Sequence, residues 1–248
     1  MKIVRRVLNV AAKELYDDHG LTWLAEAPFI KELSVNDKKE PYPITWDEQA
    51  SLLEYLPRHL QEMMLFTVNT GCRDQEVCHL RWEWEVEVPE LNTSVFILPA
   101  GITKGKRSKV IVLNAIARGV IERVRGNHPE FVFAYRGNGI YQMNNTGWKK
   151  ARLAAGLPDL RVHDLRHTFA TRLRALDTSF EDRRDLLGHK TKWATEHYSH
   201  VTIGRLIKEV EKLCPNAFGG LPKSVMLRVP AELNSRKFPA GKKKRSAV

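Results

Sequence analysis

Tyr198 follows His189 by nine residues, in the segment L-L-G-H-K-T-K-W-A-T-E-H-Y. Four residues that could work with this pair stand in three earlier motifs, T-G-C-R, T-K-G-K-R and H-D-L-R: Arg73, Lys104, His163 and Arg166. Two arginines, two histidines, a lysine and a tyrosine are the side chains needed to cut a phosphodiester with an amino-acid nucleophile and to hold the product covalently.

Such a reaction places three demands on a protein. Negative charge builds on the non-bridging phosphate oxygens, so fixed cations must face them, and arginine suits this because it stays charged and can hold two oxygens. Tyrosine has a pKa of about 10, so its attack benefits from those cations and from a neighbour that takes its proton. The 5′ hydroxyl leaves poorly unless an acid protonates it.

Helical spacing gives the two arginine motifs a usable geometry. His163 and Arg166 are three residues apart, so their side chains share one face of a predicted helix. Arg73 and Glu76 repeat this spacing directly after Gly71, which breaks the preceding helix. Taken singly, such pairs are usually solvated charges or modest surface ion pairs. The functional interpretation therefore depends on the order and conjunction of all the motifs.

In order and spacing the motifs resemble the tyrosine recombinase (phage integrase) family across about residues 45–213. The resemblance implies an α+β, mostly helical catalytic domain with a small antiparallel sheet. It makes Tyr198 the nucleophile, in preference to Tyr141 and Tyr135, which lack the spacing from an L-G-H motif. It also implies that the acid three residues after the first arginine, Glu76, buttresses the site.

The lysine-rich turn leaves one catalytic role open. By resemblance, Lys104 of the T-K pair is the general acid on the leaving oxygen, and Lys106 is the alternative. We expect contacts with duplex DNA from five basic side chains: Lys106, Arg107, Lys109, Lys149 and Lys150. Three histidines beside the motifs are interpreted as packing residues or phosphate contacts: His167, His197 and His200.

The resemblance also defines the expected partners. It implies that the domain clamps double-stranded DNA, cleaves it to a 3′-phosphotyrosine and exchanges strands within a homotetramer on paired sites, without a cofactor or a membrane. An accessory DNA-bending protein is compatible with it. No carboxylate cluster is placed in the sequence to hold magnesium, which disfavours a metallonuclease.

Two alternatives stay open. A topoisomerase would use the same chemistry, but the L-G-H motif favours a recombinase. A non-catalytic or truncated DNA-binding remnant of an integrase is the other, although the intact set of six residues argues against decay.

Charge is distributed unevenly along the chain. The formal net charge is +11, which indicates a polyanionic partner. Lys and Arg outnumber Asp and Glu by 15 to 4 over residues 91–174, so this basic middle is the expected phosphate-facing surface. Three cysteines without a CxxC pattern indicate a reducing cytoplasm, and we expect association with the nucleoid. No apolar run approaches the roughly 18 residues of a membrane span.

Four segments are predicted along the chain. Residues 1–33 read as helix and as a remnant of an N-terminal core-binding domain, and the polar residues 34–44 as a linker. Residues 45–213 form the catalytic domain, and 214–248 a basic C-terminal tail.

Within the catalytic domain, Thr45 and Glu48 form a capping box that starts a helix ending near Tyr55. Asn114 can cap a second helix, ending near Arg125. Further helices are expected over residues 58–69, 73–80, 145–155, 163–176, 179–187, 192–199 and 201–213. A β-hairpin is expected from residues 95–98 and 110–113, and a short strand from 131–133.

We predict that the chain binds DNA weakly and with little sequence preference. Proteins of the resembled kind encircle DNA with two domains, and residues 1–33 supply little of the second. Linking two modules raises avidity by on the order of 10²–10⁴ over either alone. The basic surface contacts phosphates, which carry no sequence information, so affinity should fall steeply with salt. Salt titrations on the attachment site and on random duplex check this, and nanomolar site-selective binding at physiological salt would contradict it.

Overall fold

The computed structural model describes residues 2–31, 39–188 and 200–214, which belong to two compact units, residues 1–40 and 41–248. In the first unit, α1 spans Lys2–Lys13. The expected helix over residues 1–33 is wrong beyond Lys13. Asp17 accepts backbone hydrogen bonds from His19 at 2.9 Å and Leu21 at 2.8 Å, and this local turn competes with helical hydrogen bonding.

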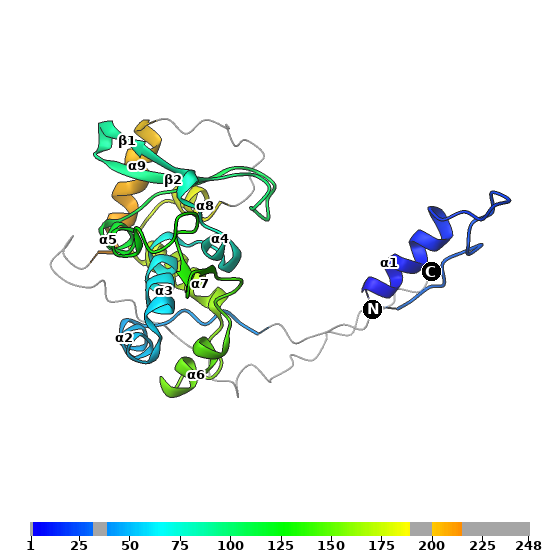
Figure 1. Ribbon diagram of the computed structural model, residues 1–248, viewed down its shortest axis with the longest axis horizontal. Coiled ribbons are helices and arrows are strands. Elements are labelled where there is room, and N and C mark those ends of the chain that lie inside the picture. The colour runs from blue at the N-terminus through cyan, green and yellow to red at the C-terminus, as the bar shows by residue number, and fades with distance from the viewer. Residues whose placement is uncertain (1, 32–38, 189–199, 215–248) are drawn as a thin grey trace, which may run out of the picture. The chain divides into compact units, whose positions relative to one another are not determined.

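The second unit is mostly helical with a small antiparallel sheet, which confirms the expected fold class (Figure 1). Its helices are α2 (Trp46–Tyr55), α3 (Arg58–Thr70), α4 (Asp74–Cys78), α5 (Ala115–Val124), α6 (Thr146–Ala154), α7 (Val162–Ala175), α8 (Phe180–Leu187) and α9 (His200–Glu211). Its strands are β1 (Glu85–Val88), β2 (Thr93–Leu98), β3 (Lys109–Ile111), β4 (Ala134–Tyr135) and β5 (Asn138–Gly139). No helix in the described part of the chain is both long and apolar enough to cross a membrane.

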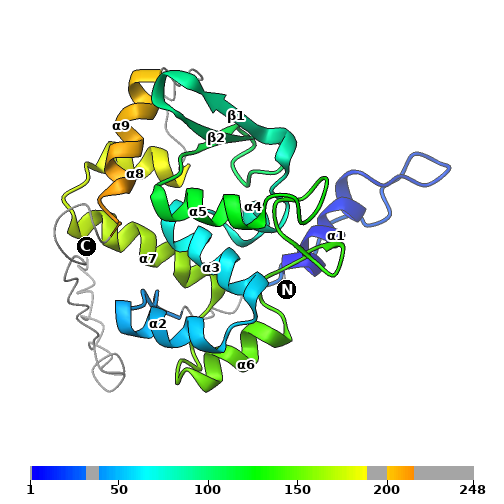
Figure 2. The ribbon, with the colours of Figure 1, turned by 60° about the vertical axis from the view of Figure 1, so that its left-hand side comes forward.

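Helix α7 is fixed between two hydrophobic clusters. The larger cluster surrounds α3, which packs against α5 and α7, and it includes Leu165 of α7 (Figure 2). The smaller cluster joins Phe169 and Leu173 of α7 to residues of the sheet, α8 and α9. Side chains on the remaining face of α7 are therefore held in place by packing on both sides of the helix.

The sheet has the strand order β1-β2-β3, with antiparallel pairing throughout. The hairpin predicted from the sequence is β2–β3, and β1 was missed. Acidic residues at alternate positions of β1, Glu85 and Glu87, hide its apolar character, as is common in an edge strand. The strand expected at 131–133 is also wrong: Phe131 forms only an isolated bridge with Arg81, and the second pairing is β4–β5.

Two helix starts agree with the sequence. The Thr45 hydroxyl accepts from the Glu48 backbone N–H at 3.2 Å, and the Glu48 carboxylate accepts from the Thr45 N–H at 2.8 Å. The Asn114 side chain accepts from the Ala117 N–H at 2.9 Å and caps α5. The helix expected at 192–199 lies outside the described residues.

Gly71 ends α3 where that helix meets α7. Its φ of 65° lies in the left-handed region, and its N–H donates to the Thr67 carbonyl. A Cβ at this position would lie 2.4 Å from Cδ1 and 2.7 Å from Cε1 of Phe169, which is fully buried. Both the backbone conformation and the close approach of α7 therefore require glycine.

We predict that Gly71→Ala destabilises the second unit by on the order of 2–5 kcal/mol, because left-handed strain and overpacking of Phe169 add together. Urea unfolding measures the loss. Gly156→Ala is the matched control, since Gly156 has a φ of 74° but no atom within 4 Å of the added Cβ. Equal losses in the two variants would show that the contact with Phe169 is unimportant.

Candidate active site

Four of the six predicted catalytic residues line one cavity of about 540 Å³: Arg73, Lys104, His163 and Arg166. They come from the start of α4, the β2–β3 turn and the first turns of α7. Gly188 lines the same cavity. The two remaining predicted residues, His189 and Tyr198, lie outside the described residues.

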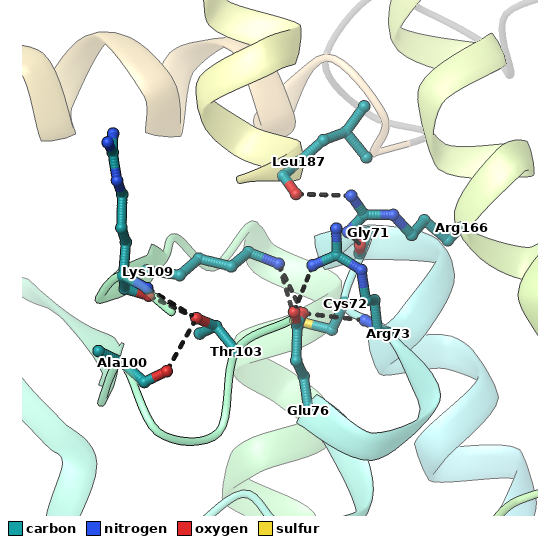
Figure 3. Close-up of polar contacts among 10 residues, drawn as sticks. Gly71, Cys72, Arg73, Glu76, Ala100, Thr103, Lys109, Arg166 and Leu187 are labelled. Carbon is teal, nitrogen blue, oxygen red and sulfur yellow. Dashed lines mark hydrogen bonds and ion pairs between the residues drawn. The ribbon is translucent and has the colours of Figure 1, made fainter. Parts of the chain in front are cut away.

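Arg166 is the buried centre of the site, with 5% of its surface exposed. Its Nη1 donates to the Gly71 carbonyl at 2.5 Å and its Nη2 to the Leu187 carbonyl at 2.6 Å (Figure 3). Each of these nitrogens carries a second hydrogen. Burial, and then the nearby charge of Arg73, lowers the pKa of Arg166 to about 10, so the guanidinium is still charged at neutral pH.

Arg73 is held in place by an ion pair with the Glu76 carboxylate. Its Nη1 donates to Glu76 Oε1 at 2.7 Å, and its backbone N–H donates to Glu76 Oε2 at 3.0 Å. The Lys109 ammonium donates to the same Oε2 at 2.8 Å (Figure 3). Burial alone would raise the pKa of Glu76, but Lys109 and the N–H groups of Arg73 lower it to about 2, so Glu76 is ionised at neutral pH.

His163 is suited to accept a proton at neutral pH. Its ring stands edge-on to that of His167, with centroids 4.8 Å apart, and both residues line the cavity. Burial lowers the pKa of His163 from its usual value, and the neighbouring His167 and Arg166 lower it further. A neutral imidazole is a general base, whereas an imidazolium is not.

The β2–β3 turn separates the candidate lysines. Lys104 is exposed and lines the cavity; Lys106, also exposed, takes a left-handed φ of 52° and is not among the lining residues. Thr103 closes the turn by donating to the Arg107 carbonyl at 2.6 Å. This geometry favours Lys104 for the acid role.

The expected DNA-contacting residues divide into two groups. Four are exposed, on the turn and on α6, and their role stays a prediction: Lys106, Arg107, Lys149 and Lys150. Lys109 is buried with a 4% exposed side chain, so its expected place on the DNA-facing surface is wrong. The physical reason is its ion pair with Glu76, which draws the ammonium inward.

Asp164 of the H-D-L-R motif has a structural part that the sequence-based predictions did not include. This fully buried carboxylate accepts from the Arg161 backbone N–H at 2.9 Å and the Tyr42 N–H at 3.1 Å. Burial would raise the pKa of Asp164, but these donors and the Arg161 guanidinium keep it below its usual value. An acid at the third position of a helix is the signal that could have identified it as a cap.

The model of the phage integrase family matches residues 44–205. The chain belongs to the phage integrase family. Among curated relatives, the integrase of Salmonella phage P22 is 25% identical over 231 residues, covering 86% of this chain and 56% of that protein. Tyrosine recombinase XerA of Pyrococcus furiosus is 27% identical over 195 residues, covering 74% and 66%. The chain thus spans less than two thirds of the length of these relatives.

The fold is similar to that of solved recombinases. A complex of the XerH site-specific recombinase with its palindromic difH substrate, after cleavage, matches with a TM-score of 0.52 and 17% identity. The match covers 75% of this chain and 57% of that one. The resemblance stated from the motifs is thereby confirmed at the level of family and fold.

Proposed function

We propose that this protein is a site-specific DNA recombinase that cleaves and rejoins DNA strands through a 3′-phosphotyrosine intermediate at Tyr198. The observation that carries the proposal is the convergence of Arg73, Lys104, His163 and Arg166 on one cavity. These residues come from segments up to 93 positions apart in sequence (73 to 166), and the cavity reaches Gly188, directly before His189.

In the proposed reaction, the Tyr198 oxygen attacks the phosphorus and the bond to the 5′ oxygen of the next nucleotide breaks. The tyrosine proton passes to neutral His163, and the Lys104 ammonium gives a proton to the departing oxygen. Arg73 and Arg166 face the non-bridging oxygens and stabilise their developing charge. Attack by another 5′ hydroxyl on the phosphotyrosine reverses these steps and rejoins a strand, so no ATP is consumed.

Double-stranded DNA is the proposed partner. Recombination between two duplexes exchanges four strands, and each cleavage uses one tyrosine. A homotetramer on paired sites therefore supplies the required number of nucleophiles. The names of the relatives, an integrase and a recombinase, support this reading over a topoisomerase.

We predict that Tyr198→Phe abolishes covalent attachment to DNA, because phenylalanine lacks the attacking oxygen. Substrates are duplexes selected from a random-sequence library by their covalent capture on the wild-type chain. Each carries a nick, so that cleavage releases a short strand that ends in a 5′ hydroxyl. Once this strand has diffused away, it cannot attack the phosphotyrosine, and the adduct is trapped. A shifted band in a denaturing gel reports it.

Tyr141→Phe is the matched control, because Tyr141 is 77% exposed and stands outside the motif spacing. It should form the adduct at the wild-type rate. The adduct should also form in excess EDTA, since arginine and lysine supply the positive charge. An adduct that survives in Tyr198→Phe would overturn the assignment of the nucleophile.

We predict that Lys104→Ala slows cleavage by on the order of 10², as loss of a general acid commonly does. A substrate with sulfur in place of the bridging 5′ oxygen should remove most of this defect, because a thiolate leaves without being protonated. Single-turnover rates on both substrates provide the measurement.

Lys106→Ala is the comparison, because Lys106 lies in the same turn but away from the cavity lining. On each of the two substrates, Lys106→Ala should show about the same ratio of its cleavage rate to the wild-type rate, so sulfur should give no rescue. If instead Lys106→Ala is slow and is rescued by sulfur, then Lys106 is the general acid.

A further inference from the structure

We propose that Lys109 is a positioning residue of the active site: its buried ammonium fixes the Glu76 carboxylate, which in turn holds Arg73 toward the cavity. The effect of Lys109 on catalysis rests on the proposed function, whereas its contacts with Glu76 exist without DNA.

Lys109 begins β3, opposite Leu98 in the β2–β3 register. Its Nζ lies 2.8 Å from Glu76 Oε2 and 3.9 Å from the Cys72 sulfur. The second oxygen of the same carboxylate accepts from Arg73 Nη1 at 2.7 Å. Figure 3 shows the Lys109 and Arg73 side chains reaching the carboxylate from different elements. One carboxylate thus joins a strand of the sheet to a cavity-lining arginine.

A direct contact with DNA does not account for this placement. A lysine that binds phosphate must present its ammonium to solvent. Lys104, in the adjoining β2–β3 turn, is exposed. Only 4% of the Lys109 side chain is exposed, and its partner Glu76 is 2% exposed. A charge is taken out of water at a high free-energy cost unless it is paired, so the ion pair is what keeps Lys109 there.

The charges around Glu76 show what Lys109 contributes. Lys109 approaches from β3, Arg73 from the start of α4 and Arg166 from α7, with the Cys72 thiol beside them. Burial favours the neutral acid, and Lys109 is the strongest of the influences that oppose it. Without that ammonium, burial should raise the pKa of Glu76. A protonated Glu76 carries no negative charge and can only accept a hydrogen bond from the Arg73 guanidinium, which is weaker than an ion pair.

The stem of Lys109 also touches the end of α8. A Cβ at Gly188 would lie 3.0 Å from Cδ and 3.3 Å from Cγ of Lys109. The preceding carbonyl, that of Leu187, accepts from Arg166. Lys109 therefore contacts both the carboxylate behind Arg73 and the turn that helps to hold Arg166.

Two variants separate positioning from other roles. Lys109→Met keeps most of the side-chain length and removes the charge, and Lys109→Met with Glu76→Gln also removes the titrating carboxyl. Arg123→Met is the matched control: it leaves another glutamate, Glu62, without its arginine, beside a different cavity. Equal folding of all variants is checked by thermal unfolding.

The first measurement needs no DNA. Carbon-13 NMR of the Glu76 carboxyl should show an ionised group in the wild-type chain down to about pH 4, and titration above that in Lys109→Met. An unchanged titration would overturn the proposal, whether or not the protein cuts DNA.

The second measurement is single-turnover cleavage of the captured duplexes across pH. Lys109→Met should lose cleavage by on the order of tenfold per pH unit below the raised pKa of Glu76, with non-covalent DNA binding unchanged. The double variant should be slow but should regain the wild-type pH dependence. His163 and His167 titrate in all three proteins, so the differences between profiles report on Glu76.

Three outcomes would count against a positioning role. If binding and cleavage fall together in Lys109→Met, the lysine is a phosphate contact. If Arg123→Met produces the same pH-dependent loss, the effect is one of general stability. If Lys109→Met cleaves like wild type at every pH, Arg73 needs no such support. If the wild-type chain itself forms no adduct, the proposed function fails, and the NMR titration alone decides whether Lys109 governs Glu76.

Discussion

A single buried carboxylate allows several like charges to share one small region. Arg73 and Lys109 both donate to Glu76, and the charge of Arg73 is felt at Arg166, where it contributes to a lowered pKa. Two unit charges about 4 Å apart interact by roughly 4 kcal/mol near a protein surface. Without an opposing charge, such repulsion would turn the arginines away from one another. Glu76 offsets this repulsion permanently, and in the proposed reaction a bound phosphate would do so as well.

Helix ends supply the rest of the electrostatic frame. Arg166 donates to the Gly71 carbonyl, at the end of α3, and to the Leu187 carbonyl, at the end of α8. The carbonyl ends of helices carry partial negative charge and stabilise cations. Two helices therefore point their negative ends at Arg166, which is almost fully buried. Together with the nearby charge of Glu76, this arrangement helps a guanidinium at 5% exposure to remain charged.

The order of the motifs and most helix boundaries could be predicted from the sequence, because capping and helix-ending signals such as Thr45 and Gly71 are local. The direction of individual basic side chains could not be predicted from the sequence. Lys104 lies in the β2–β3 turn and Lys109, five positions later, begins β3, yet Lys104 lines the cavity and Lys109 is buried. That difference depends on Glu76, which lies 33 positions earlier and approaches only in the folded chain. Counting charges overestimates a DNA-facing surface for this reason.

Burial in the same cavity leaves His163 neutral and Arg166 charged, and the proposed chemistry needs both of these protonation states. Burial lowers the pKa of both His163 and Arg166, because it penalises the charged form of each. For the histidine, the shift starts near neutrality and favours the neutral ring, which can take a proton from tyrosine. For the arginine, it starts far above neutrality and ends at about 10, so the positive charge remains. A cavity deep enough to make a base of His163 therefore leaves Arg166 as a cation, and no separate device is needed to divide the roles.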